Sequence, residues 1–142
     1  LAESMTALNN RASAAALEVG AVCATDITGF GLLGHASHIA RASQVTLRID
    51  VARVPLLPGA REVALRGVRT GGADRNLSYL DALVDWGSAS EIDRILMIDP
   101  QTSGGLLVAL SPERARRYLS LVPEAVEIGE VLPARSTGLV LA

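Results

Sequence analysis

The amino-acid sequence predicts a single layered domain of the α+β or α/β class. Helix-like and strand-like apolar patterns alternate along 142 residues, which is enough chain to bury one core. Apolar residues make up 49% of the sequence but aromatic residues only 3%, so the core has to be built from Leu, Val, Ile and Ala. Short strands interleaved with helices bury their apolar sides by stacking in layers, which favours the predicted class.

The beginning of the chain predicts two helices separated by a strand and a turn. Over residues 1–19 apolar residues recur at helical spacing, and Gly20 then stops the pattern. These residues are Met5, Leu8, Ala12, Ala15 and Val19. Residues 21–25 predict a short strand, 26–31 a turn, and 32–43 a helix with one apolar side. This side consists of Leu33, Ala36, Ile39 and Ala40.

The middle of the chain predicts a strand followed by shorter elements. Apolar and polar residues alternate over residues 45–51, which predicts a half-buried strand. Pro55 and Pro58 bracket a loop before a short helix at 59–66. Residues 67–76 contain three glycines and few apolar anchors, so an irregular loop is expected there.

The last part of the chain predicts a short helical piece, two helices and three strands. Ser111, Pro112 and Glu113 are a typical helix start, with an N-cap, a first-position proline and an acid in the first turn. The predicted elements are, in order, a helical piece at 77–83, a helix at 90–97, a polar loop at 99–105, a buried strand at 106–110, a helix from Ser111 to about Leu121, and strands at 126–132 and 138–141 that pair as a hairpin.

Composition excludes several classes of function. All thirteen basic residues are arginine, which removes the lysine of a P-loop and Schiff-base chemistry. The net charge of −2 gives no electrostatic case for nucleic-acid binding. Cys23 is the only cysteine, so no intrachain disulfide or cysteine zinc cluster can form, and a cytoplasmic setting fits. No apolar run has transmembrane length. The start at Leu1, without Met, suggests a fragment.

The candidate site begins at Asp26, which follows an apolar strand and precedes Gly29, Gly31 and Gly34. A carboxylate at a strand end is a suitable Mg²⁺ ligand, and a glycine-rich helix entry can approach phosphate. Alternatively, Asp26 caps the turn and the glycines serve helix packing. The glycine spacing also matches the dinucleotide-binding pattern, though the preceding strand end, Thr-Asp, makes that match weak.

Other polar segments have both a functional and a structural interpretation. Residues 71–76 (Gly-Gly-Ala-Asp-Arg-Asn) could clamp a phosphate or form a solvated loop. His35 and His38 are three residues apart and can share a helix side, but no third metal ligand is evident, which favours a structural or surface role. Cys23 is expected to be a small core residue and Trp86 a packing anchor.

Three segments together resemble the selenophosphate synthetases (selenide, water dikinases). They are residues 24–35 (Ala-Thr-Asp-Ile-Thr-Gly-Phe-Gly-Leu-Leu-Gly-His), 71–76 with Ala73 where the family has Thr, and 99–107 (Asp-Pro-Gln-Thr-Ser-Gly-Gly-Leu-Leu). The resemblance is to the C-terminal domain, within the aminoimidazole ribonucleotide synthetase superfamily. It implies a mixed β-sheet flanked by helices, with residues 1–142 as one domain and an N-terminal catalytic domain absent.

The resemblance implies an enzyme that makes selenophosphate from selenide, ATP and water and releases AMP and phosphate. It places Asp26 on Mg²⁺ at the ATP phosphates and no catalytic residue in this chain. It further implies a homodimer and an isolated chain that is inactive. From composition, we expect a cytoplasmic protein with no nucleic acid or membrane as partner. Residues expected near the phosphates are Thr28, Gly29, Gly31, Arg75, Asn76, Thr102 and Ser103.

Two other functions stay open at this stage. One is a non-catalytic dimerisation or scaffold module, which the abundance of Ala and Leu and the incomplete site would suit. The other is a different ATP-using member of the superfamily, against which the 99–105 segment argues.

Overall fold

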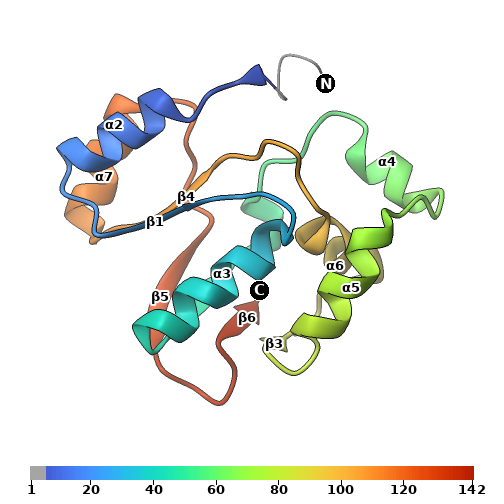
Figure 1. Cartoon of the computed structure of the whole chain (residues 1–142). Coiled ribbons are helices and arrows are strands. Elements are labelled where there is room, and N and C mark those ends of the chain that lie inside the picture. The colour runs from blue at the N-terminus through green and yellow to red at the C-terminus, as the bar shows by residue number, and fades with distance from the viewer. Residues whose placement is uncertain (1–5) are drawn as a thin grey trace.

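A computed structural model describes residues 6–142 of the chain and has α+β architecture (Figure 1). The helices are α2 (Asn10–Glu18), α3 (Gly31–Ser43), α4 (Ala60–Leu65), α5 (Gly71–Leu80), α6 (Glu91–Ile98) and α7 (Pro112–Leu121), with a short 3-10 helix η1 (Val51–Arg53). The strands are β1 (Cys23–Asp26), β2 (Val45–Ile49), β3 (Val84–Asp85), β4 (Leu106–Ala109), β5 (Gly129–Pro133) and β6 (Leu139–Leu141). Among the described helices none has the length and apolar character of a membrane span.

The strands form two sheets. The larger is mixed, in the order β3-β6-β2-β5, with β2 antiparallel to β5 and parallel to β6. The smaller is an antiparallel pair of β1 and β4, in which Asp26 lies opposite Leu106. The predicted mixed sheet with flanking helices is therefore confirmed. The predicted hairpin is wrong, because β2 lies between β5 and β6 and takes both as partners.

The main core lies between α3 and the mixed sheet. Leu33 and Ala36 of α3 are fully buried, as is Leu139 of β6, and the predicted apolar side of the helix is confirmed. Helices α5 and α6 close this core with Leu80, Met97 and Ile98. Burying one Leu, Ile or Met side chain completely contributes roughly 1.5–3 kcal/mol to the free energy of folding, relative to leaving it exposed. The half-buried Cys23 and Trp86 pack against the same core, as predicted.

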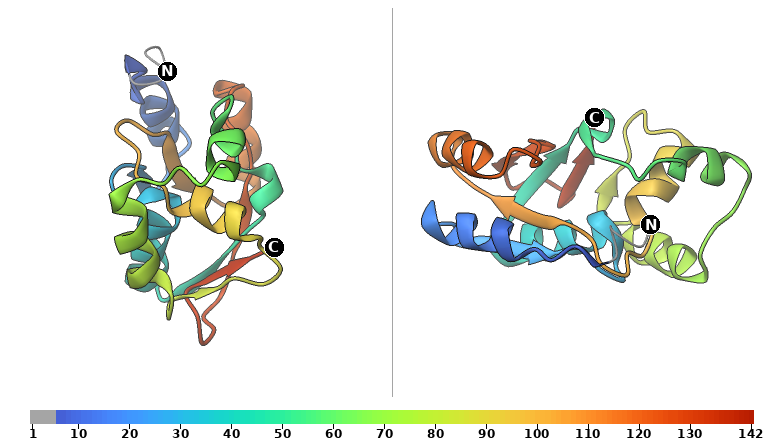
Figure 2. Two further views of the ribbon diagram at one scale, coloured as in Figure 1. Left: turned by 90° about the vertical axis from the view of Figure 1, so that its right-hand side faces the viewer. Right: turned by 90° about the horizontal axis from the view of Figure 1, so that it is seen from above.

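A second, smaller core lies beneath α2 and α7, which run side by side at one end of the molecule (Figure 2). Its buried members are Ala15, Ala16, Val19, Tyr118 and Val122. The Tyr118 hydroxyl donates to the Ala12 carbonyl across the two helices, at 3.3 Å. The β1–β4 pair connects this cluster to the rest of the fold, because Leu106 and Val108 pack against it.

The helix predicted over residues 1–19 is confirmed as α2, which ends before Gly20 at φ 72°, and at Thr6, whereas residues 7–9 are not helical. Met5 lies outside the described residues, and Leu8 is 79% exposed, so it does not belong to the buried side. The Asn9 side chain donates to the Gly104 carbonyl at 3.0 Å. This long-range bond holds the chain in a turn where local periodicity predicted helix.

The loop predicted over residues 67–76 is wrong from Gly71 onward, since helix α5 begins there. The Thr70 hydroxyl accepts a hydrogen bond from the Ala73 amide at 3.3 Å, and Asp74 lies in the first turn. Both features stabilise a helix start, and glycine costs less there than in a helix interior. The piece predicted at 77–83 is the second half of this helix, which ends at Leu80.

Two strands differ from expectation in their burial. Thr46 is one of the polar residues in the alternating pattern that predicted the half-buried strand β2, yet it is fully buried. Its burial is compensated, because its hydroxyl donates to the Thr137 carbonyl and accepts from the Arg135 amide, each at 2.9 Å. Strand β4 was expected to be buried but is only half-buried, because it belongs to a two-stranded sheet. The short strand β3 was not predicted.

Candidate functional site

The first and third of the three motifs are joined through their main chains. The Ile27 amide donates to the Gly105 carbonyl and the Gly104 amide to the Ile27 carbonyl, each at 2.9 Å. The Gln101 amide donates to the Thr28 carbonyl at 3.0 Å. Close approach is possible because Gly104 has no side chain, and a Cβ at this position would collide with the Ile27 carbonyl oxygen. The turn after β1 and the loop before β4 therefore form one unit.

Asn76 attaches the second motif to this unit. The side chain of Asn76 is buried, and its Nδ2 donates to the Gly29 carbonyl at 3.0 Å and to the Ile98 carbonyl at 2.9 Å. The two carbonyls belong to the turn before α3 and to the end of α6. A single amide group thus connects α5, α3 and α6, and both its N–H groups are used in doing so.

A cleft of about 470 Å³ opens where the three motifs meet. It is lined by Thr28, Gly29, Phe30, Thr70, Gly72, Arg75, Asn76 and Pro100. Four of these are predicted site residues, namely Thr28, Gly29, Arg75 and Asn76. Phe30, Thr70, Gly72 and Pro100 were not predicted. A capping pattern at Thr70 would have identified the start of α5, but nothing local indicated that α5 lies beside α3.

The electrostatics of the cleft favour an anion. Helices α3 and α5 both begin at its edge, and the amide-rich N-terminal end of a helix carries partial positive charge. Arg75 adds a full charge and forms no ion pair among the described residues. Arg69 differs, because it pairs with Glu91 at 2.9 Å and Asp74 at 3.9 Å. Arg75 is therefore the cation available to a ligand.

Gly31 lies near the cleft but does not line it. It is buried, has φ +66°, and an added Cβ would be 2.6 Å from the main-chain carbon and oxygen of Ile98. Its absent side chain lets the start of α3 pack directly on the end of α6. The structure thus gives Gly31 a packing role.

Replacing Gly31 with Ala is expected to destabilise the chain by about 2–4 kcal/mol. This is the sum of the free-energy costs of a left-handed backbone conformation and of an overpacked contact. Urea unfolding of the 142-residue chain measures this. Gly71→Ala is the matched control, because its Cβ would meet no atom within 4 Å. This control is expected to change stability by less than about 1 kcal/mol. Equal losses in both variants would contradict the packing role.

The other predicted residues do not line the cleft. Asp26 is the exposed last residue of β1, and its carboxylate has no hydrogen bond or ion pair within residues 6–142. Thr102 is exposed and Ser103 half-buried in the loop before β4. No group of three His, Cys, Asp or Glu residues in the described part of the chain could hold a metal. Asp26 could therefore supply only one ligand to a shared ion.

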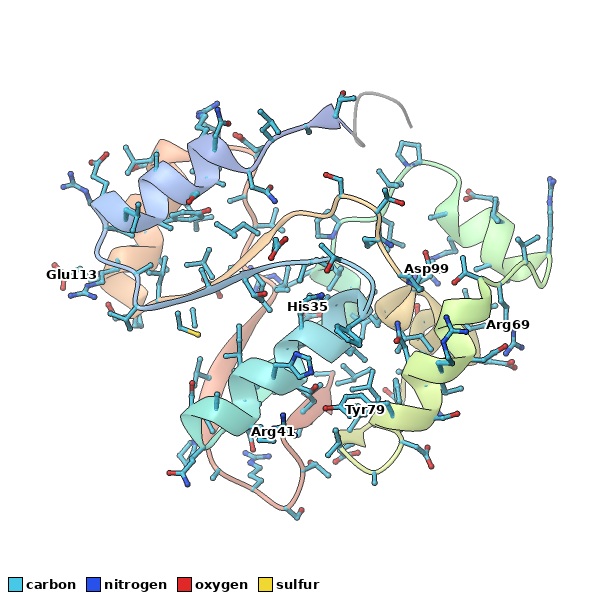
Figure 3. All side chains as sticks on the ribbon, in the orientation of Figure 1. His35, Arg41, Arg69, Tyr79, Asp99 and Glu113 are labelled. Atoms are coloured by element: carbon cyan, nitrogen blue, oxygen red, sulfur yellow. The ribbon has the colours of Figure 1, made fainter. Side chains whose placement is uncertain are left out.

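His35 lies near the start of α3, against the segment of chain that leads from β1 into this helix (Figure 3). Its Nε2 accepts a hydrogen bond from the Thr28 amide at 3.1 Å, and its Nδ1 lies 3.4 Å from the Thr25 hydroxyl. Burial, followed by the neighbouring His38, lowers the pKa of the His35 imidazole, against an opposite effect of Asp26. The two histidine rings share a helix side, as predicted, with centroids 6.2 Å apart. The His38 ring also contacts the ring of Tyr79 of α5, with centroids 6.3 Å apart.

Comparison with known proteins adds a family and a set of relatives. A family model described as AIR synthase related protein, C-terminal domain, matches residues 2–142. Proteins named selenide, water dikinase are 42% identical over 142 residues in Geobacter metallireducens and 43% over 133 residues in Caldanaerobacter subterraneus. These alignments cover 97% and 94% of this chain but 41% and 39% of the relatives. The chain thus spans about two fifths of the length of the relatives it matches.

Proposed function

Because the chain belongs to the family described as AIR synthase related protein, C-terminal domain, we propose that it is part of an enzyme that makes selenophosphate. The whole enzyme would use selenide, ATP and water and release AMP and phosphate. The observation that carries the proposal is that three motifs resembling selenophosphate synthetases meet around one anion-compatible cleft. The names of the relatives support the same substrates. The catalytic nucleophile and most of the metal ligands would come from an N-terminal domain.

In this proposal the cleft receives the phosphate side of ATP. The first turn of α5 and the entry to α3 present main-chain amides at the cleft edge, and Arg75 provides a guanidinium for a phosphate oxygen. Thr28 contributes a hydroxyl. Thr102 and Ser103, in the loop bonded to the same turn, are assigned to the periphery. Phosphoryl transfer depends on this kind of positioning and charge stabilisation.

Asp26 fits a role as a Mg²⁺ ligand. Its carboxylate is exposed, is not engaged by other described residues, and ends a strand whose next residues lead into the cleft. Mg²⁺ is commonly held by one or two carboxylates together with phosphate oxygens and water. The ion would neutralise phosphate charge during transfer. The role of Asp26 would be to anchor the ion on the C-terminal side of the site.

The proposal also includes a homodimer, as the family resemblance implies, and a cytoplasmic location, which the single cysteine favours. Its direct test is phosphorus NMR of the whole protein incubated with Mg²⁺, ATP and selenide. Selenophosphate, AMP and phosphate are expected to form together and only when selenide is present. The 142-residue chain alone is expected to be inactive. ATP consumption without selenide would favour another ATP-using enzyme, and no consumption by the whole protein would favour a scaffold module.

A further inference from the structure

We propose that His35 is a positioning residue that sets the conformation of the segment carrying Asp26 and Thr28. The part of this inference that concerns Mg²⁺ binding by Asp26 rests on the proposed function. The hydrogen bonds that carry it are independent of that function. The two ring nitrogens of His35 contact residues that flank Asp26 in the sequence. Nδ1 lies beside Thr25, which precedes Asp26, and Nε2 beside Thr28, which follows it. The ring thereby spans the segment that leads from β1 into the cleft.

The chemistry of the contacts determines which nitrogen carries the proton. The main-chain amide of Thr28 can only donate, so Nε2 of His35 has to be unprotonated to accept it at 3.1 Å. The neutral ring then carries its proton on Nδ1, which faces the Thr25 hydroxyl. That hydroxyl donates in turn to the Asp26 carbonyl at 3.1 Å. The lowered pKa of the imidazole agrees with a neutral ring that accepts at Nε2.

The location of His35 makes it suitable for this task. It lies on the second turn of α3, whose buried side is fixed by Leu33 and Ala36 in the main core. A ring attached to a helix of the main core can fix the exposed part of the segment, because Asp26 and Gly29 are exposed on either side of the buried Ile27. Thr28 lines the cleft and its hydroxyl lies 3.1 Å from the same Nε2, so the ring also restrains the orientation of that hydroxyl. His35 therefore acts through its neighbours and does not reach the cleft itself.

The variants His35→Gln and His35→Asn separate acceptor function from bulk. Glutamine can place a carbonyl oxygen near the position of Nε2, whereas the shorter asparagine reaches only the position of Nδ1. His38→Asn is the matched control, because His38 lies on the same helix and makes ring contacts but no hydrogen bond among the described residues. The experiment uses the whole protein and two readouts. The first is hydrogen exchange of a peptide spanning residues 25–30, and the second is the Mg²⁺ concentration for half-maximal activity.

His35→Asn is expected to accelerate exchange of the peptide and to raise the Mg²⁺ requirement by about 10-fold or more, as for other groups that orient a metal ligand. In His35→Gln, the exchange rate and the Mg²⁺ requirement are both expected to stay close to those of the parent protein. His38→Asn is expected to change neither the exchange rate nor the Mg²⁺ requirement. Unchanged exchange in His35→Asn, or equal effects from His38→Asn, would overturn the inference. Faster exchange with an unchanged Mg²⁺ requirement would overturn the metal-positioning role. If the whole protein makes no selenophosphate, the proposed function fails while the exchange readout still decides whether His35 holds the turn.

Discussion

Asp26→Asn is expected to lower selenophosphate formation by the whole protein by about 10²-fold or more, a loss typical of removing a group that stabilises charge in the transition state. The amide keeps the size of the carboxylate but loses the negative charge that Mg²⁺ prefers. Stability should hardly change, because the Asp26 side chain is exposed and makes no hydrogen bond or ion pair within residues 6–142. The measurement is the initial rate of AMP and selenophosphate formation at saturating ATP.

Asp81→Asn is the control for this experiment. Asp81 is also exposed, but it follows the last turn of α5, whereas the cleft lies at the first turn. Its replacement is expected to leave the rate within about twofold, as for a surface change away from the site. An active Asp26→Asn variant with an unchanged Mg²⁺ requirement would show that Asp26 is not a metal ligand.

Asn76→Asp is expected to destabilise the 142-residue chain by about 3 kcal/mol, because the buried carbonyl of Ile98 and the partly buried carbonyl of Gly29 lose their donor. An ionised carboxylate would face the carbonyl oxygens of Gly29 and Ile98, which now accept from Nδ2. The repulsion would separate the start of α3 from the end of α6 and so distort the cleft. Urea unfolding measures the loss of stability. The cleft region is expected to unfold at a lower urea concentration than the α2–α7 cluster.

Asn10→Asp makes the same chemical change at an exposed position. The Asn10 side chain accepts a hydrogen bond from the Arg11 amide at 2.8 Å, and a carboxylate can accept it equally well. This variant is expected to stay within about 0.5 kcal/mol of the parent. If Asn76→Asp is equally mild, the buried amide is not what holds the three motifs together.

Local chemistry was sufficient to predict elements that have strong start and stop signals. Helix α6 begins at Glu91, after Ser90, whose hydroxyl and the Asp93 side chain form a reciprocal cap, and the predicted boundary is within one residue. The bounds and the buried side of helix α3 agree closely with those predicted from its apolar spacing. The start of helix α5 was not predicted, because Gly71 and Gly72 are typical of a loop. Gly72 is explained by a tertiary contact and not by the local structure. An added Cβ there would be 2.6 Å from the Pro100 ring, so the glycine permits a contact with the third motif.

The composition of the site was partly predictable from the motifs. Thr28, Gly29, Arg75 and Asn76 were predicted and line one cleft, whereas the assignment of Asp26 to a metal stays a prediction. Phe30 and Thr70 were not predicted, because a residue's place on a cleft depends on neighbours that are distant in sequence. A structural or surface role was favoured for His35, and its hydrogen-bond partners became known only from the fold.

The sequence by itself determined the α+β class, most helix starts and the three motifs, since caps, glycine stops and apolar spacing act over a few residues. Only the tertiary structure decided that β2 separates β5 from β6 and that Thr46 is buried. It alone brought Asn76 to Gly29 and Ile98. The physical reason is that strand pairing and buried hydrogen bonds join groups far apart along the chain. Their energies depend on which surfaces the whole fold brings into contact.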